Sequence, residues 1–395
     1  MSKILYIIIS LSLGVLVYWF LPKRSRSIFL LAASLFFMSF FSIKYTLYFL
    51  LIALSIYFTG IFIQKEDKNK ILFLKLALFF LIGNICVFKY IDSLLNAIFR
   101  IGFQFPVIPE TTFSKIAIPM GMSYIIFRLI HYVVEIYRKT LPAHTFWDLA
   151  LYVFFFPTFL AGPVDRFQRF QPQTTEHKSF ESSDINYGLL RIVSGMIKKF
   201  IIADHLKPLV ISVLSSPQES LWAIVVLAIY GLAIQIYMDF SGYTDMAVGV
   251  ARLFGYKIME NFNYPYFKKN IALFWRNWHI SVYSFIRDYF FFPFFGYRAS
   301  RKKIYIGIFI TMIVFMLWHE ASLPFLFLGI YHGSGLVLWQ GFQELKGKHG
   351  SIKKMVDNKY LDPLLNFLTF SFVSFSFIFF SFDMNAIKAI FLRIF

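Results

Sequence analysis

The stretch that decides the fold runs from Trp275 to His319 and reads WRNWHISVYSFIRDYFFFPFFGYR, then the basic segment ASRKK, then an apolar run that ends in LWH. It places His279 and His319 among aromatic and aliphatic side chains, and three charged residues lie near the first histidine: Arg276, Arg287 and Asp288. An ionisable group within a membrane-spanning region is disfavoured by about 2.5 to 3.5 kcal/mol on insertion scales. These residues therefore indicate a functional site in apolar surroundings.

The composition of the chain indicates a membrane protein. Hydrophobic residues make up 58% of the 395 residues, aromatic residues 21%, and charged residues only 15%. Soluble globular domains carry about 25% charged residues. Because one crossing needs about 20 apolar residues, the chain has room for roughly ten or eleven crossings. We predict an all-α polytopic membrane protein with about 10 to 11 transmembrane helices, plus re-entrant or interfacial helices.

The basic residues predict the orientation of the first spans. The net charge is +18, but Lys and Arg fall in short clusters between apolar runs, as in cytoplasmic loops, and not on one stripe that would bind nucleic acid. We expect spans at Ile4–Leu21, Ile28–Phe41 and Tyr45–Gln64, with the N-terminus outside. The segment Lys65–Lys70 would then lie in the cytoplasm.

Two features before residue 170 interrupt the apolar sequence. His131 and Glu135 are four residues apart and share a helix face, which fits either a buried polar site or a helix end near the membrane interface. Pro157, Gly162 and Pro163 prevent a regular helix after an apolar run. This second segment is either a re-entrant or interfacial piece that lines a cavity, or an ordinary loop.

The stretch MDFSGYTD places Asp239, Tyr243 and Asp245 directly after an apolar helix. Two carboxylates here either face a cavity, pair with an arginine, or cap the helix at a water interface. Further along, Arg276 and His279 are three residues apart and so share a helix face. Two tryptophans flank them: Trp275 and Trp278.

Four motifs in this order resemble the membrane-bound O-acyltransferase family: FPTFLAGPVDRFQRF, MDFSGYTDMAVGVARLFGY, NFNYPYFKKNIALFWRNWHISVYSFIRDYFFFPFFGYR and LWHEASLPFLFLGIYHG. The resemblance covers roughly Ile118 to Gly341. Within the family, the chain is similar to two bacterial branches, the D-alanyl-lipoteichoic acid transfer proteins and the alginate or peptidoglycan O-acetyltransferases. D-alanyl transfer to a teichoic-acid-type acceptor is slightly favoured, and acetyl transfer to alginate, peptidoglycan or another exopolysaccharide is the alternative.

The resemblance implies a funnel or tunnel of tilted helices, with an acyl donor entering from the cytoplasm and an acceptor hydroxyl from outside. It implies that His319 is catalytic and that His279 is a second candidate, for positioning or proton handling. A histidine in an apolar wall suits this chemistry, because burial keeps the imidazole neutral and able to accept the alcohol proton. The expected substrate-binding or supporting residues are Trp275, Arg276, Asn277, Trp278, Arg287, Asp288, Asp239, Tyr243 and Glu320.

Glu320 departs from the family pattern, which usually has glycine after this histidine. Its carboxylate would either orient the imidazole of His319 or only cap the helix end. No HExxH motif or comparable ligand spacing is present, so we expect no metal. A transporter is the competing class of protein, since it would also place polar groups between spans, but we find no internal repeat.

We therefore expect one integral-membrane domain, residues 1–395, with peripheral N-terminal spans (1–100), the family core with the active site (118–341), and a C-terminal span and tail (361–395). No tightly bound cofactor is expected. The resemblance implies a donor that is a phosphopantetheine thioester on a carrier protein or an acyl-CoA, an acceptor polymer of the cell envelope, and an extracytoplasmic partner acyltransferase. It also implies multi-pass insertion in the bacterial cytoplasmic membrane.

Overall fold

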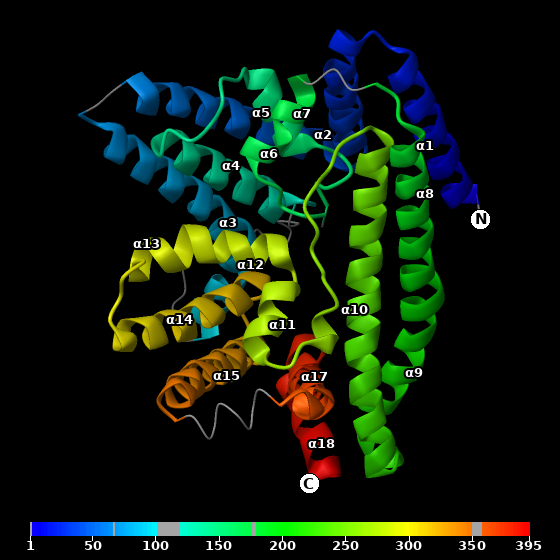
Figure 1. Ribbon diagram of the computed structural model, residues 1–395, viewed down its shortest axis with the longest axis vertical. Coiled ribbons are helices and arrows are strands. Elements are labelled where there is room, and N and C mark those ends of the chain that lie inside the picture. The colour runs from blue at the N-terminus through cyan, green and yellow to red at the C-terminus, as the bar shows by residue number, and fades with distance from the viewer. Residues whose placement is uncertain (1, 66–67, 101–118, 161, 176–178, 350–357) are drawn as a thin grey trace. The chain divides into compact units, whose positions relative to one another are not determined.

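The computed structural model describes residues 2–65, 68–100, 119–160, 162–175, 179–349 and 358–395, and these residues form helices and connecting segments without a strand (Figure 1). The protein is thus an all-α polytopic membrane protein, as predicted. Ile118, where the family core was expected to begin, lies outside the described residues. The chain divides into two compact units, each of which is described by itself.

Unit 1 comprises Met1–Val193 and Asp245–Met259. Its helices are α1 (Ser2–Phe20), η1 (Lys23–Ser25), α2 (Arg26–Lys65), α3 (Lys70–Arg100), α4 (Met122–Tyr137), α5 (Phe146–Phe154), α6 (Phe167–Phe170), α7 (Pro172–Thr175) and the greater part of α8 (Ser182–Met196).

Unit 2 comprises Ser194–Thr244 and Glu260–Phe395. Its helices are η2 (Ile197–Ala203), α9 (Asp204–Ser215), η3 (Pro217–Glu219), the greater part of α10 (Trp222–Leu253), η4 (Pro265–Phe267), α11 (Ile271–Asn277), α12 (Ile280–Ile286), η5 (Arg287–Phe291), α13 (Phe292–Phe295), α14 (Arg301–His319), α15 (Leu323–Lys348), η6 (Lys359–Leu361), α17 (Asp362–Ser381) and α18 (Met384–Ile394).

Five helices within the described residues are long and apolar enough to cross a membrane: α2, the first part of α3, α10, α14 and α17. This is fewer than the ten or eleven crossings that the length of the chain allowed. Part of the difference arises because several apolar segments form short helices, such as α4 with 16 residues and α5 with nine, and the count covers only the described residues. The predicted second and third spans form one element, α2, with non-helical backbone at Ser42 between them.

A buried arginine supports the irregular backbone that follows α5. The side chain of Arg128 in α4 is 1% exposed and donates to the carbonyl oxygens of Tyr152 at 3.1 Å, Val153 at 2.8 Å and Thr158 at 3.2 Å. Tyr152 and Val153 lie in the last turn of α5, whose carbonyl groups lack intrahelical donors, and Thr158 lies in the irregular segment itself. Non-helical backbone away from water is tolerated where protein surrounds it in this way. The predicted interruption at Pro157 is therefore a buried, protein-lined segment and not an exposed loop.

Glycines bring α14 and α15 together in unit 2, where the two helices pack along each other (Figure 1). A Cβ atom at Gly329 would lie 2.7 Å from the Cα of Ile313, and one at Gly333 would lie 3.1 Å from the ring of Phe309. Small residues at such positions let helix backbones approach closely. The space beside these glycines is thus filled by α14.

Candidate active site

His279 lies in unit 2, where α11 ends and α12 begins. The side chain of Asn270 caps α11 by accepting the N–H of Leu273 at 2.8 Å. After α11, Trp278 is extended and His279 has left-handed backbone angles, with φ 45° and ψ 49°. The helix thus breaks between Arg276 and His279, and the expectation that they share a helix face was wrong. The left-handed conformation costs a residue other than glycine roughly 1 to 2 kcal/mol, and strained backbone of this kind clusters at functional sites. The turn holds the ring of His279 in the interior, where it is 2% exposed.

Asn261 determines which ring nitrogen of His279 carries the proton. The side-chain oxygen of Asn261 accepts the backbone N–H of Ser281 at 3.3 Å and its hydroxyl at 2.6 Å, and it lies 3.4 Å from His279 Nδ1. Because a backbone N–H only donates, the atom facing Ser281 must be the oxygen, and Nδ1 must then carry a hydrogen to contact it. Nε2 of His279 is therefore left with a lone pair that can accept a proton.

Electrostatics keep this imidazole neutral. Burial lowers the pKa of His279 well below its ordinary value, and the nearby His319 lowers it further. Two histidines close enough to interact in this way resist carrying positive charge together. A positive charge on either ring therefore makes protonation of the other ring less favourable.

His319 ends α14 and is the more accessible of the two histidines. Its ring is half-buried, in contrast to that of His279. Aromatic rings surround it, and their centroids lie between 4.5 and 6.3 Å from its own: Phe315, Trp318, Phe325 and Phe380. His319 therefore lies in a largely aromatic environment and is only partly covered by it.

Trp275 and Trp278 are both buried, but they pack in different places. Trp278 stacks with Tyr266 and Phe274 at centroid distances of 5.9 and 5.4 Å, so it belongs to an aromatic core. Trp275 contacts Phe315 at 5.5 Å, and Phe315 in turn contacts His319. Trp275 is therefore the tryptophan that lies behind the wall of the His319 site.

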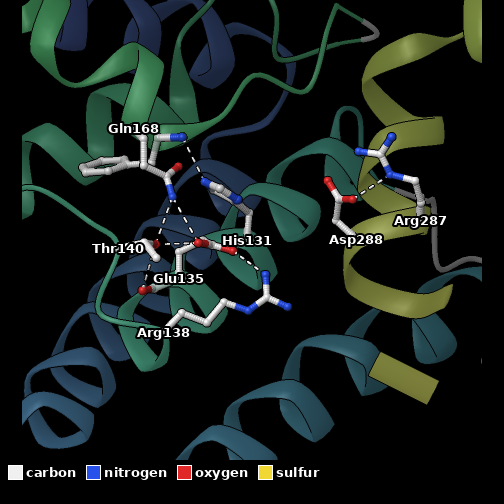
Figure 2. A network of polar contacts seen from close by, with 8 residues as sticks. His131, Glu135, Arg138, Thr140, Gln168, Arg287 and Asp288 are labelled. Carbon is white, nitrogen blue, oxygen red and sulfur yellow. Dashed lines mark hydrogen bonds and ion pairs between the residues drawn. The ribbon is translucent and has the colours of Figure 1, made fainter. Parts of the chain in front are cut away.

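The charged candidates lie at the periphery of unit 2. Arg276 and Glu320 are exposed, and Glu320 is the residue that follows the last turn of α14 as its C-cap. Arg287 donates to the carboxylate of Asp288 at 2.8 Å (Figure 2). The side chain of Asn277 donates to the carbonyl oxygen of Leu273 at 2.7 Å. The structure thus brings His279, His319 and Trp275 together, whereas Arg276 and Glu320 face outward.

The two carboxylates of the stretch MDFSGYTD form ion pairs. Asp245 in unit 1 pairs with Arg191 at 2.6 Å, which confirms pairing with an arginine for this residue. Asp239 in unit 2 pairs instead with Lys199, which also reaches Asp204 at 3.1 Å. Between them Tyr243 is half-buried.

Sequence reasoning missed two neighbours of His279. One is Asn261, which lies 18 residues upstream of it, and the other is Phe240, whose ring meets that of His279 edge to face at 4.7 Å. The signal for Asn261 was present, since an asparagine in the apolar stretch NFNYPY needs partners when it is buried. Phe240 is one of 53 phenylalanines, and nothing in the sequence distinguishes it.

The pair His131 and Glu135 forms a buried polar network in unit 1 (Figure 2). His131 Nε2 accepts the backbone N–H of Phe167 at 2.9 Å, and Glu135 accepts from Arg138 at 2.7 Å and from Gln168 at 3.2 Å. Of the two alternatives for this pair, the buried polar site is confirmed. Because the Nε2 lone pair of His131 is occupied, this histidine supports the start of α6.

Comparison with known proteins decides the family. The model of the membrane-bound O-acyltransferase family, MBOAT, matches residues 30–346 of the chain. The chain belongs to this family. The match begins in α2, so it is longer than the range from Ile118 to Gly341 in which the resemblance was recognised, and it contains both His279 and His319. The protein is accordingly an O-acyltransferase with several membrane-crossing helices.

Relatives from both bacterial branches are similar to the chain. The protein named probable alginate O-acetylase AlgI of Azotobacter vinelandii is 33% identical over 341 residues, which are 85% of this chain and 67% of the relative. The AlgI protein of Pseudomonas aeruginosa is 31% identical and covers 93% of this chain and 68% of the relative. The teichoic acid D-alanyltransferase of Bacillus subtilis is 32% identical over 266 residues, 64% of this chain and 65% of that protein.

Proposed function

We propose that this O-acyltransferase moves an acetyl group from a cytoplasmic thioester donor to a hydroxyl of an extracytoplasmic cell-envelope polysaccharide, with His319 as the general base. The observation that carries this proposal is the pair of histidines in unit 2. One ring is half-open within an aromatic wall, and the other is buried, neutral and coupled to it. A general base for acyl transfer must be within reach of the substrate hydroxyl, and of the two rings His319 meets this requirement.

The proposed reaction balances as follows. The hydroxyl proton passes to the His319 imidazole while the alcohol oxygen attacks the thioester carbonyl carbon. Collapse of the tetrahedral intermediate breaks the carbon–sulfur bond, and the leaving thiolate takes the proton back from the imidazolium. His279 stays neutral, because Asn261 accepts from its Nδ1 and its burial opposes a charge. A neutral neighbour does not oppose the transient positive charge on His319.

Two observations favour an acetyl group over a D-alanyl group in this proposal. The D-alanyl group carries an ammonium, which needs a counter-ion when it leaves water. The carboxylates of Asp239 and Asp288 already contact Lys199 and Arg287. The relatives named as alginate O-acetylases also match 85% and 93% of this chain, against 64% for the Bacillus subtilis D-alanyltransferase.

D-alanyl transfer, which the sequence analysis slightly favoured, is the second candidate, because identity to the Bacillus subtilis protein is 32%, between the 33% and 31% of the two O-acetylases. Under either reading we propose a donor that is an acyl-CoA or a phosphopantetheine thioester on a carrier protein. The proposal also includes an extracytoplasmic partner acyltransferase and insertion in the bacterial cytoplasmic membrane.

Mass spectrometry of cell-envelope polymers tests this function. Polymers from cells that produce the protein should carry an ester-linked acetyl group that is absent from cells producing His319→Ala. His349→Ala is a matched control, since His349 is exposed beyond the end of α15, and it should leave the acetyl ester in place. A D-alanyl ester that depends on His319 would favour the second candidate. An unchanged ester content in His319→Ala would contradict the proposed role of this histidine.

A further inference from the structure

A second buried histidine in unit 2, His332 in α15, has a hydrogen-bonded imidazole that takes no part in the proposed reaction. Its side chain is 3% exposed, and Nε2 lies 2.8 Å from the hydroxyl oxygen of Ser376 in α17. The Ser376 hydroxyl donates its only hydrogen to the carbonyl oxygen of Val373 at 2.6 Å. Ser376 must therefore accept from His332, so Nε2 of His332 carries the hydrogen and Nδ1 carries a lone pair.

Nδ1 of His332 is fully buried and has no hydrogen-bond partner among the residues that the structure describes. The ring of Trp275 in α11 packs edge to face with the ring of His332, with centroids 5.0 Å apart. The indole N–H of Trp275 is likewise buried and without a partner in the described part of the chain. A buried polar group without a partner costs about 1 to 3 kcal/mol. Of these two buried groups, Nδ1 of His332 is an acceptor and the indole N–H of Trp275 is a donor.

We propose that Trp275 and His332 form a binding site for one hydroxyl group, which accepts the indole N–H and donates to His332 Nδ1. A single hydroxyl satisfies both atoms, because it is donor and acceptor at once. Water is the proposed occupant, since buried waters in proteins bridge polar groups of this kind. A small alcohol presents the same chemistry and is the other source of a hydroxyl.

The occupied site would link α11 to α15, and through Ser376 to α17. Trp275 is the first residue of the sequence WRNWH that leads to His279, and its ring contacts Phe315, which contacts His319. His332 is therefore a positioning residue: the bridging hydroxyl holds Trp275, and Trp275 supports the wall of the histidine site. The effect of His332 on activity rests on the proposed function, whereas the presence of the bridging hydroxyl does not.

Nuclear magnetic resonance of the full-length protein in lipid nanodiscs tests occupancy without reference to activity. The ¹⁵N shifts of His332 should show a protonated Nε2 and an unprotonated Nδ1. The indole proton of Trp275 should show a cross-relaxation peak to water in the absence of any substrate. If glycerol, added as an alcohol probe, replaces that peak with one of its own, the hydroxyl is an alcohol. Absence of both peaks, or a protonated Nδ1, would overturn the proposal.

Two substitutions at residue 332 separate its two nitrogen atoms. The side-chain amide of His332→Asn places an oxygen near the position of Nδ1, whereas that of His332→Gln reaches towards Ser376 near the position of Nε2. We expect His332→Asn to keep the Trp275 water peak and acyl transfer, and His332→Gln to lose the peak and lower kcat about tenfold with KM unchanged. Thermal unfolding checks that both variants fold.

The opposite ranking, with His332→Gln active and His332→Asn impaired, would show that only the contact with Ser376 matters and would overturn the proposal. Trp275→Phe combined with His332→Gln should be no slower than the slower single variant, because either change alone empties the site. Multiplied losses would contradict a shared hydroxyl. If the protein has no acetyl-transfer activity at all, the resonance measurements still decide occupancy.

Discussion

At the scale of single residues, the site depends on how hydrogen bonds assign protons. The sequence showed His279 and His319 as candidates, but it did not show that Asn261 accepts from His279 Nδ1 and leaves Nε2 with its lone pair. Nor did it show which ring a substrate reaches, and the structure makes His319 the accessible one. The two histidines therefore differ in burial, although both stand in apolar surroundings.

We predict that Asn261→Ala lowers kcat about tenfold, because one hydrogen bond contributes roughly 0.5 to 1.5 kcal/mol to holding His279 in a single tautomer and orientation. The rate of acetyl transfer by purified protein measures this effect. Asn263→Ala is a matched control two residues away, since the Asn263 side chain is exposed. Equal rates for the two variants would remove the role assigned to Asn261.

We predict that Glu320→Gln changes the acyl-transfer rate less than His319→Ala does, within about twofold of the unmodified protein, as expected for a surface position. Glu320 is exposed and follows the end of α14, so its charge is screened by water and salt. The same transfer assay measures this. A loss as large as that of His319→Ala would make Glu320 a partner of the histidine.

At the scale of elements, the close approach of α14 and α15 sets the position of His319 relative to the rest of unit 2. A glycine in a membrane helix can either let a neighbouring helix approach or leave open space beside the backbone. The structure decides for the first alternative at Gly329, because the backbone of Ile313 occupies the space where a side chain would lie. The sequence shows that the residue at this position is small, but it does not show which atoms fill the space beside it.

We predict that Gly329→Leu destabilises the protein by about 1 to 3 kcal/mol through overpacking against α14. Thermal unfolding in detergent micelles measures the change as a lower midpoint. Gly347→Leu in the same helix is the matched control, because nothing lies within 4 Å of a Cβ atom there. Leucine also has the higher helix propensity, so this control should unfold at the same temperature or slightly above it. A neutral Gly329→Leu would contradict the tight packing.

At the scale of the whole molecule, composition and charge predict membrane insertion and its orientation. The described residues contain five helices that could cross a membrane, with a break at Ser42 inside α2. The placement of Lys65–Lys70 in the cytoplasm rests on the charge pattern. The central funnel and the division into a family core and peripheral spans stay predictions.

Cysteine labelling tests the orientation directly. The chain has a single cysteine, Cys86, so Cys86→Ser provides a background free of thiols. In that background, Lys68→Cys should resist a membrane-impermeant maleimide in intact cells and react after permeabilisation, because basic loops stay in the cytoplasm. Ser2→Cys should react in intact cells if the N-terminus lies outside. Labelling of Lys68→Cys in intact cells would invert the topology.

The sequence by itself determined the membrane class, the helical fold, the family and the two candidate histidines. These follow from composition, from the spacing of apolar residues and from local motifs, all of which are properties of neighbouring residues. Only the tertiary structure decided that Asp239 pairs with Lys199, that Asn261 contacts His279, and that His332 meets Ser376 across 44 residues of chain. Hydrogen bonds between distant residues depend on how helices pack, and no local pattern encodes that packing.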